Sequence, residues 1–447
     1  MRILTLSAYY PPYTYGGYEI RVGDIMDGLS QRGHEIRILT TKPDFALRAI
    51  PKDFPYPVIR RLHSPARKLR FFDWLTTRKL TRWLGISLVF LREILHDIQD
   101  TALLDTQIRA FKPDLLYLGH IMPLTRAFMP FLSKMQIPIV ADEGGKGLIY
   151  SWQDHGLWQR FQAEFPEIPH FLGWLKKLTV EVVDRVSKGR VSKDWAFPKG
   201  IRAIFNSDLN RRNAEAAGVP LAETTVIHSG IDTQFFTFKR SKEFGSPLTI
   251  LVPGRIEENK RQLDAVRLGA LLKERGIPFE LVIVGGSWNS TYAEWVEAEI
   301  QTNGLQKEVR ILPMAGRADL VELYHWADIT FFPSIQNAGL SRIPLEATAC
   351  GSLLISYGCE GSDEIIRNGV NGFITIAGNI DKLGEIITNL FTNQQLYSNI
   401  TSSARTKIEN ELSLSGYIQK IEDFILNTES LKSILKQNCK EEKYYQL

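Results

Sequence analysis

The sequence predicts an α/β protein built from two Rossmann-like, doubly wound domains. Three observations support this fold class. The chain has 447 residues, and a single hydrophobic core rarely serves more than roughly 250 to 300. Short apolar runs alternate with longer segments of helical periodicity, which is typical of parallel sheets covered by helices. The same alternation begins again after a polar stretch at 239–247, so we expect a second sheet there.

The N-terminal domain, residues 1–240, opens with a strand at 2–7, a glycine loop, a helix at 17–32 and a strand at 34–41. This order is the usual beginning of a doubly wound parallel sheet. The region around 58–100 does not fit the rhythm and is predicted to be an insertion. Further strands are predicted at 114–118, 138–141, 201–205 and 225–228.

The C-terminal domain, residues 241–412, repeats the pattern more regularly. Residues 413–447 complete the chain with helical segments and a polar tail. The strands of this domain are predicted at 248–253, 279–284, 309–312, 329–332 and 353–356. Its helices are predicted at 261–275, 292–302, 320–326 and 343–350.

Composition excludes several classes of protein. A net charge of +4 on a chain of this length is too small to indicate a nucleic-acid partner. Cys350, Cys359 and Cys439 are odd in number and lack metal-ligand spacing, so neither a disulfide framework nor a zinc site is expected, and a reducing, cytoplasmic location is favoured. No window approaches the roughly 20 apolar residues of a membrane-spanning helix, so any membrane contact is expected to be peripheral.

Two segments combine basic and aromatic residues. Lys and Arg are interleaved with Trp74 and Trp83 in residues 60–93, and with Trp174 and Trp195 in residues 171–202. This combination suits a surface that meets anionic lipid headgroups. The alternative is a set of helices that bury their aromatic faces and expose their basic faces to water.

A glycine pair follows the first predicted strand. Gly16 and Gly17 lie just before a predicted helix. Glycines let backbone N–H groups approach a ligand closely, and the start of a helix carries about half a positive charge, which suits phosphate. A tight turn needed only for chain reversal gives the same pattern.

Two cations follow the strand predicted at 248–253. Gly254 and Arg255 come directly after it, and Lys260 follows five residues later. Ligands of open parallel sheets bind at the carboxyl ends of strands. The planar fork of an arginine and the point charge of a lysine together can neutralise a diphosphate. The alternative is a pair of solvated charges at a helix start, although cations are unfavourable there.

Residues 337–351 read NAGLSRIPLEATACG. Gly339 and Ser341 precede a predicted helix, so amides at its start are expected to face an anion or sugar hydroxyls. Glu346 lies in the early turns of that helix, where its carboxylate could accept hydrogen bonds from vicinal hydroxyls such as those of a ribose. The alternative is an ordinary surface glutamate.

Eight motifs together carry a family resemblance. In chain order they are AYYPPYTYGG, SDLNRRNAEAAGVP, VIHSGID, PGRIEENK, LVIVGG, LYHWADITFFPS, IPLEATACG and DEIIRNGVNGF. This series resembles that of GT-B glycosyltransferases of the retaining family-four type, the group 1 glycosyl transferases. The resemblance implies two Rossmann-like lobes facing across a cleft, a nucleotide-diphosphate sugar on the C-terminal lobe and no metal requirement. It also implies that helices near 413–427 cross back to the first lobe.

The resemblance assigns phosphate contacts to four matching residues. Arg255 and Lys260, after Gly254, would bind the donor diphosphate and stabilise the leaving group. Gly17, with Gly16, would present amides to the phosphates from the other lobe.

The resemblance also assigns contacts to the rest of the donor. Glu346 would hold the ribose hydroxyls, and His120 would touch the donor sugar, although a lone histidine after a strand is more often structural. Backbone amides facing the sugar and phosphate would come from Gly339, Leu340 and Ser341.

The chain departs from the family pattern at three places. The first acid of the E-x7-E element is Ala338, and Asn337 or a bound water would have to replace its carboxylate. The usual VIPNG reads VIHSG. The proline before the acid of the PEI element is Asp363, while Glu364 is retained.

The sequence therefore predicts a retaining hexosyltransferase-like enzyme that moves a sugar from a nucleotide-diphosphate sugar to an acceptor hydroxyl without a metal or other cofactor. A polysaccharide, a small glycoside or a lipid-linked acceptor of the cell envelope is expected, with Asp142 and Glu143 as candidate contacts and peripheral contact with an anionic membrane. Two alternatives stay open. One is a catalytically silent nucleotide-sugar or lipid-binding subunit, suggested by Ala338, and the other is a GT-B nucleotide-sugar epimerase.

Overall fold

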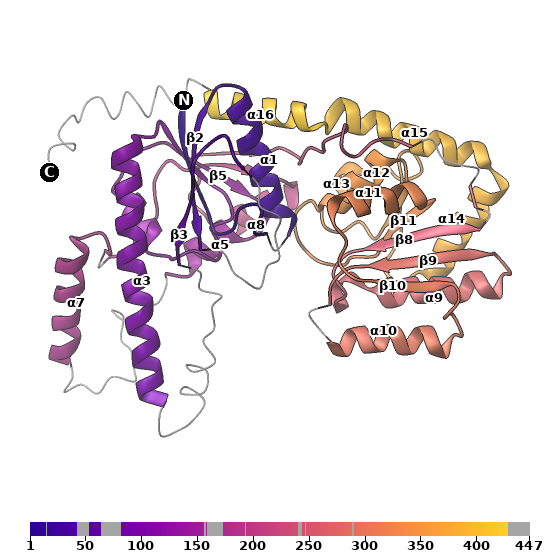
Figure 1. Ribbon diagram of the computed structural model, residues 1–447, viewed down its shortest axis with the longest axis horizontal. Coiled ribbons are helices and arrows are strands. Elements are labelled where there is room, and N and C mark those ends of the chain that lie inside the picture. Colours follow the sequence, from indigo (N-terminus) through magenta and orange to yellow (C-terminus); the bar gives the residue numbers. More distant parts are fainter. Residues whose placement is uncertain are drawn as a thin grey trace. The chain divides into compact units, whose positions relative to one another are not determined.

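The chain forms two compact units, each a parallel sheet with helices (Figure 1). This confirms the predicted α/β class with two Rossmann-like domains. The first unit contains the described residues up to Phe205, residues Asn210–Val226 and those from Ile421 onward, and the second contains Asn206–Leu209 and Ile227–Lys420. The second unit therefore takes over the chain at Ile227, whereas the predicted division falls after residue 240. The computed structural model describes residues 1–14, 16–42, 53–63, 82–155, 158, 173–192, 194–239, 244–245, 247–287 and 290–427.

The first unit holds a seven-stranded parallel sheet in the order β3-β2-β1-β4-β5-β6-β7. The strand order reverses at β1, which pairs with both β2 and β4, so this is the switch point where such sheets bind ligands. The strands are β1 (Arg2–Ser7), β2 (Glu35–Thr41), β3 (Val58–Leu62), β4 (Leu115–Leu118), β5 (Ile139–Glu143), β6 (Arg202–Phe205) and β7 (Glu223–Val226). The helices between them in sequence are α1 (Gly17–Gln31), α3 (Arg82–Phe111), α4 (Phe128–Leu132), α5 (Gly147–Gln153), α7 (Gly173–Ser187) and α8 (Asp208–Ala216).

The second unit holds a six-stranded parallel sheet in the order β10-β9-β8-β11-β12-β13, with its switch point at β8. The strands are β8 (Leu248–Pro253), β9 (Phe279–Val284), β10 (Val309–Leu312), β11 (Ile329–Phe332), β12 (Leu353–Ser356) and β13 (Phe373–Ile374). A 3-10 turn, η2 (Glu258–Lys260), follows β8. The helices are α9 (Gln262–Glu274), α10 (Ser290–Thr302), α11 (Arg317–Trp326), α12 (Arg342–Cys350), α13 (Ser362–Ile365), α14 (Ile380–Thr392) and α15 (Gln394–Glu411). Helix α16 (Leu414–Leu426) begins in this unit, and its residues from Ile421 onward belong to the first.

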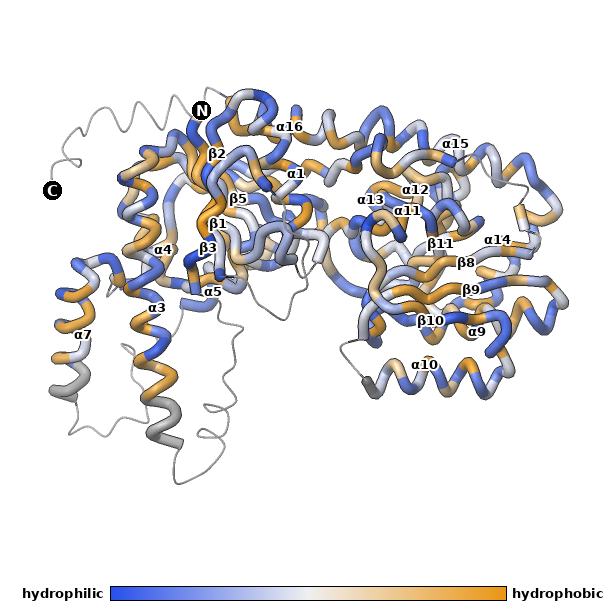
Figure 2. The backbone as a smooth tube through the Cα atoms, viewed as in Figure 1, coloured by the Kyte–Doolittle hydropathy of each residue, from blue (hydrophilic) through white to orange (hydrophobic). Residues whose placement is uncertain are grey.

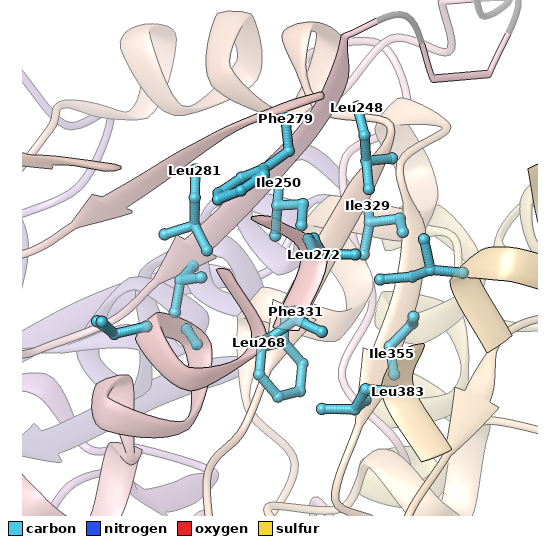
Figure 3. Packing of buried hydrophobic residues seen from close by; sticks show 14 of the residues in the cluster. Leu248, Ile250, Leu268, Leu272, Phe279, Leu281, Ile329, Phe331, Ile355 and Leu383 are labelled. Carbon is cyan, nitrogen blue, oxygen red and sulfur yellow. The ribbon is translucent and has the colours of Figure 1, made fainter. Parts of the chain in front are cut away.

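The core of the second unit explains why its strands were easy to predict. Strands β8 to β12 match the predicted ranges residue for residue. Every residue of β8 is buried, so the strand reads as one continuous apolar run. Figure 3 shows Leu248 and Ile250 of β8 in the same cluster as Leu268 of α9 and Leu383 of α14, all fully or almost fully buried. Full burial of each such side chain contributes about 1.5 to 3 kcal/mol.

The region 58–100 is predicted from sequence to be an insertion, but the residues of it that the structure describes form a strand of the first sheet and part of a long helix. Residues Val58–Leu62 form β3 at the edge of the first sheet, pairing in parallel with β2, and Arg82–Phe111 form the long helix α3. Only Leu62 of β3 is fully buried, so this strand lacks the apolar run that marks the others. An edge strand contacts the sheet on one side alone, and its sequence signal is correspondingly weak.

Helices α3 and α7 share a small core of their own. Buried Ile94 of α3 packs with Trp158, Val183 of α7 and Val191. Figure 2 shows apolar segments along both helices. Among the described residues, every helix is too short or too polar to cross a bilayer.

Candidate functional site

The predicted site residues fall into two groups, one in each unit. In the second unit, the carboxyl ends of β8 and β9 approach each other closely. The amide of Gly254 donates to the carbonyl of Val284 at 3.0 Å, and Gly254 has a φ of +137°, which favours glycine. A Cβ atom on Gly285 would lie only 2.0 Å from the carbonyl oxygen of Gly254. The two glycines are therefore required where the chain turns from β8 toward Arg255.

Lys260 ends the 3-10 turn that follows this junction, and it is buried with 8% exposure. Its ammonium group contacts the carboxylate of Glu360 and lies 3.5 Å from Oγ of Ser334. The hydroxyl of Ser334 also donates to the carboxylate of Glu360. A buried ammonium is costly unless it is paired, so Glu360 supplies the charge that lets Lys260 stay inside.

Arg255 is more accessible than Lys260. Its side chain is 41% exposed, and Nη2 lies 3.0 Å from Oε1 of Glu257. An ion pair at this exposure stabilises the fold little, because water screens it. The guanidinium can therefore exchange Glu257 for another anion at small cost.

The loop after β11 carries the predicted sugar and phosphate amides. Gly339 and Leu340 are buried, and the carbonyl of Leu340 accepts a hydrogen bond from the side chain of Asn206 at 3.1 Å. The amide of Ser341 is already used, since it donates to the carbonyl of Glu360 at 3.0 Å. Glu360 thus joins Lys260 to this loop through both its side chain and its backbone.

Two buried acceptors beside this loop lack a partner among the residues that the structure describes. They are Oε1 of Gln336 and Oδ1 of Asn259. Both residues adjoin Ser334, whose Oγ accepts from the amide of Gln336 at 3.3 Å and lies 3.4 Å from the carbonyl oxygen of Asn259. Buried oxygens without donors are suited to ligand hydroxyls.

Glu346 is buried in the first half of α12 with 7% exposure. The hydroxyl of Tyr324 donates to its Oε2 at 3.1 Å, and Nε of Arg342 donates to its Oε1 at 3.3 Å. Burial, with the nearby carboxylate, raises the pKa of Tyr324 well above its usual range. Each oxygen of Glu346 keeps capacity for a second hydrogen bond, because a carboxylate oxygen has two lone pairs.

One departure from the family pattern, the histidine of VIHSG, contacts the retained acid of the PEI element. His228, from VIHSG, places Nε2 2.8 Å from Oε2 of Glu364. Glu364 also accepts from the backbone amides of Asp208 and Leu209 at 2.8 and 3.2 Å, at the start of α8. Burial alone would raise the pKa of Glu364, but these hydrogen bonds outweigh it and hold the pKa below its usual value. Glu364 is therefore a helix cap rather than an available carboxylate.

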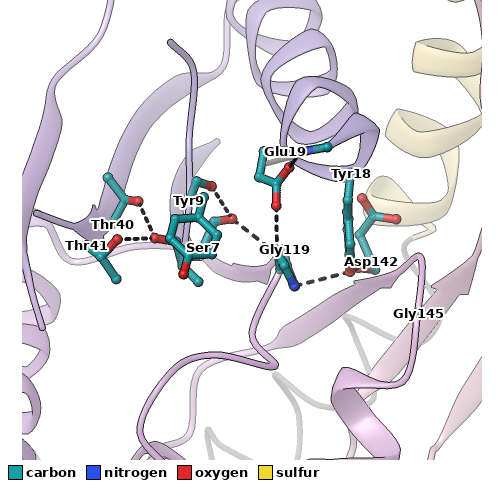
Figure 4. Close-up of polar contacts among 12 residues, drawn as sticks. Ser7, Tyr9, Tyr18, Glu19, Thr40, Thr41, Gly119, Asp142 and Gly145 are labelled. Carbon is teal, nitrogen blue, oxygen red and sulfur yellow. Dashed lines mark hydrogen bonds and ion pairs between the residues drawn. The ribbon is translucent and has the colours of Figure 1, made fainter. Parts of the chain in front are cut away.

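The first unit contains the second group of predicted residues. Nδ1 of His120, after β4, lies 2.8 Å from Oε1 of Glu19, and Oε2 of Glu19 accepts from the amide of Gly16 at 2.9 Å. Gly16 and Gly17 are exposed at the start of α1. Figure 4 shows Glu19 and Tyr18 extending from α1 toward the turn at Gly119. The ring of Tyr18 stacks on His120 with centroids 4.8 Å apart.

The two acidic acceptor candidates have partners inside the first unit. Asp142 is fully buried and pairs with Nη2 of Arg21 at 2.9 Å, and burial raises its pKa. The hydroxyl of Tyr18 donates to the carbonyl of Asp142. Glu143, also buried, accepts from the amides of Gly145 and Leu148 at 2.7 and 2.6 Å. These partners give both acids a structural part, and their contact with an acceptor stays a prediction.

Glu19, Gln336 and Glu360 are among the residues of these groups that were not predicted from the sequence. Glu19 had a recognisable signal, because an acid three residues after a helix-starting glycine is typical of a capping interaction. Gln336 and Glu360 had none, since only the fold brings them beside Lys260.

Two family models match adjacent parts of the chain. The model described as Glycosyltransferase Family 4 matches residues 15–235, and the model described as Glycosyl transferases group 1 matches residues 233–407. Together they cover residues 15–407, which include every strand of the two sheets except β1. The chain belongs to the group 1 glycosyltransferases of the GT-B fold.

Curated relatives of this glycosyltransferase differ in how much they cover. Glycogen synthase of Mycobacterium tuberculosis is 22% identical over 416 residues, 92% of this chain and 91% of that one. The amylovoran biosynthesis glycosyltransferase AmsK of Erwinia amylovora is 27% identical over 205 residues, 44% of this chain. The match spans only about half of AmsK, 49% of its length.

Solved structures show the fold of this glycosyltransferase. Sucrose-phosphate synthase from Thermosynechococcus elongatus gives a TM-score of 0.66 at 14% identity, over 96% of this chain and 98% of that chain. HepE of Anabaena in complex with UDP gives a TM-score of 0.58 at 16% identity, over 95% and 99%. The predicted GT-B architecture is thereby confirmed.

Proposed function

We propose that this glycosyltransferase transfers a sugar from a nucleotide-diphosphate sugar to an acceptor hydroxyl, with retention of configuration and without a metal. The observation that carries the proposal is the cationic group after β8. Arg255 and Lys260 lie within a few residues of Gly254, whose backbone approaches Gly285 too closely for a side chain at that position. This contact lies at the switch point of the second sheet.

Departure of the nucleoside diphosphate is the step that these cations assist. Negative charge builds on the leaving phosphate as the bond to the sugar breaks, so preorganised cations stabilise the transition state more than the bound donor. Arg255 supplies a guanidinium group that can leave Glu257 for a phosphate, and Lys260 supplies a buried ammonium group. Because these side chains supply the positive charge, the reaction needs no divalent ion. Retention would follow if the leaving phosphate accepts the proton of the acceptor hydroxyl on the same face of the sugar.

The polar loop residues are proposed to hold the rest of the donor. Gln336 and Asn259 offer buried oxygens for sugar hydroxyls, which would compensate for Ala338. Glu346 is proposed to accept from the ribose, and Gly339 to present its amide. In the first unit, His120 is proposed to bind a sugar hydroxyl through Nε2, with its ring oriented by Glu19.

Uridine nucleotides are the first donors to test, since HepE of Anabaena was solved with UDP and with UDP-glucose. The acceptor is proposed to be a glycan or a lipid-linked sugar, with the enzyme in peripheral contact with an anionic membrane. The exposed face of α7 supports this, because Leu178, Val182 and Val186 are 47%, 51% and 59% exposed and follow a four-residue spacing.

The test begins with binding. UDP, GDP and ADP and their glucose derivatives are screened by thermal shift, where a ligand at about 100 times its dissociation constant adds about 2.7 kcal/mol. The bound donor is then incubated with acceptors, in chelator, and the anomeric configuration of the product is read by NMR. Transfer with retention supports the proposal, and inversion or a strict metal requirement contradicts the corresponding part.

The silent subunit remains the second candidate, because Ala338 replaces an acid and Glu360 neutralises Lys260. Donor binding without transfer or hydrolysis across the acceptor panel would favour it. An incubation without acceptor distinguishes the epimerase, which alone would convert the donor into another nucleotide sugar.

A further inference from the structure

A carboxylate occupies the position at Lys260 where a phosphate is expected. The side chains of Lys260 and Glu360 are 10% and 8% exposed, and Oε1 of Glu360 contacts both the ammonium of Lys260 and the hydroxyl of Ser334. Glu360 lies 100 residues after Lys260 in the chain. Any phosphate that reaches Lys260 therefore meets a negative charge already in place.

The backbone of Glu360 has a conformation that is uncommon for residues other than glycine. Its φ is +51°, in the left-handed region that glycine adopts most readily, and Gly361 next to it has a φ of +68°. A non-glycine residue in this conformation is strained, because its Cβ crowds the backbone. A side chain retained at such a position commonly has a function that offsets the strain.

The turn that carries Glu360 is held firmly. Its carbonyl accepts from the amide of Ser341, and a Cβ atom on Gly361 would lie 2.7 Å from Cα of Leu340. The loop before α12 thus fixes the backbone, so only the side chain of Glu360 is available to move when a ligand arrives.

We propose that Glu360 is a resident anion that the donor diphosphate displaces from Lys260, and that it thereby sets the affinity of this site for nucleotides. The inference rests on the proposed function, because it takes Lys260 as a ligand of the diphosphate. Without ligand, the carboxylate compensates the buried ammonium. With ligand, phosphate oxygens take over the ammonium group, and the carboxylate turns away because two anions repel at this distance. Separating Glu360 from Lys260 costs free energy, and this cost lowers the affinity of the site for a nucleoside diphosphate.

The test is calorimetric titration of the full chain with UDP, GDP and ADP at one pH and low ionic strength. Glu360→Gln keeps the shape of the side chain and removes its charge, so it is expected to bind the preferred diphosphate about tenfold more tightly than the natural chain. Glu360→Gly suits the left-handed φ and is expected to tighten binding as well. Unfolding temperatures are recorded first, and titrations are run where every variant is folded, since breaking a buried pair destabilises.

The matched control is Glu280→Gln. Glu280 of β9 pairs with Arg310 of β10 at 3.2 Å, and both side chains are exposed. The change therefore removes one charge from the second unit without touching Lys260. Less than about twofold change is expected.

The outcomes separate the two proposals. Tighter binding by both Glu360 variants, or binding that appears only in them, supports a resident anion. Equal binding overturns it and leaves the donor site intact. Weaker binding by both also overturns it, because Glu360 would then be a direct ligand. If none of the proteins binds any of the three diphosphates, the proposed donor site itself fails.

Discussion

The carboxylate of Glu19 lies 2.8 Å from Nδ1 of His120 and is almost completely buried, with 2% exposure. In the neutral imidazole, a carboxylate partner at Nδ1 selects the tautomer with its proton there, and Nε2 is left as the acceptor. His120 ends no helix or strand, so its ring orientation depends on Glu19 and on stacking with Tyr18.

His120 and Glu19 are expected to act as one unit in transfer. His120→Ala should lower kcat about tenfold or more, since one lost hydrogen bond costs roughly 1 to 2 kcal/mol. Glu19→Gln should lower kcat less, with little change in KM for the donor. The double variant should be no slower than His120→Ala alone. Steady-state kinetics of the four proteins gives the answer, and additive losses would show that Glu19 acts elsewhere.

Lys260→Ala should affect both stability and activity, because it leaves the carboxylate of Glu360 buried without its partner. The free energy of unfolding is expected to fall by about 3 to 5 kcal/mol. Adding Glu360→Gln should recover most of this loss but not the transfer rate, which should stay about 100- to 1000-fold low. Urea denaturation and initial rates of the single and double variants measure the two effects.

Lys273→Ala is the control for that experiment. Lys273 is 46% exposed and lies 3.3 Å from Glu308, so its removal should cost less than about 1 kcal/mol. If the double variant of Lys260→Ala with Glu360→Gln recovers its transfer rate, Lys260 has no part in catalysis.

Asp97 on α3 should make the protein less stable as pH rises. Burial raises its pKa to about 7, with smaller contributions from the nearby carboxylates of Glu93 and Asp100. Between about pH 4 and 7 the unfolded chain has lost this proton while the folded chain still holds it. The free energy of unfolding therefore falls with pH across this interval and is constant above it.

Asp97→Asn removes this dependence and keeps an acceptor for the hydroxyl of Thr125. The free energy of unfolding of this variant should exceed that of the natural chain by an amount that grows from pH 4 to 7 and reaches on the order of 4 kcal/mol. Urea denaturation at several pH values checks this. Glu385→Gln, from an exposed pair with Lys382, controls for the loss of one charge. A difference that does not vary with pH would contradict the assignment.

Gly285→Ala should disturb the donor site through the backbone. Its Cβ would overlap the carbonyl of Gly254, which must move, and Arg255 would move with it. We expect a loss of about 1 to 3 kcal/mol or more in stability and weaker nucleotide binding. Gly276→Ala is the control, because Gly276 has open space for a Cβ, and its φ of +67°, which Gly285 does not share, is the source of any cost there. It should cost about 1 to 2 kcal/mol and leave binding unchanged.

The exposed face of α7 should bind anionic vesicles. Leu178→Ser with Val182→Ser is expected to weaken cosedimentation with phosphatidylglycerol vesicles about tenfold, because less apolar surface enters the interface. Met314→Ser in the second unit, where Met314 is 80% exposed, should have no effect. Failure of the natural chain to bind at low salt would end the membrane part of the proposal.

The parts of the fold that could be predicted are those with a strong local pattern. Strands β8, β9, β11 and β12 are almost entirely buried and read as apolar runs bounded by polar turns, and the edge strand β10 was predicted from its apolar residues Val309, Ile311 and Leu312. Strands β3 and β13 were not predicted, because β3 contains two arginines and only one buried residue, and β13 has only two residues. In the same way, α3 was hidden in a region whose basic and aromatic residues suggested a surface segment.

Sequence alone determined the two-domain α/β class and the family, and it predicted Arg255 and Lys260 as the cations of a donor site, because periodicity and motif spacing are properties of neighbouring residues. Only the tertiary structure decided which of these charges meet an opposite charge. Glu360 reaches Lys260 from 100 residues away, and Glu19 reaches His120 from 101 residues away. Such pairs depend on which strand ends lie side by side and on how much water the packing excludes, and neither is written in local sequence.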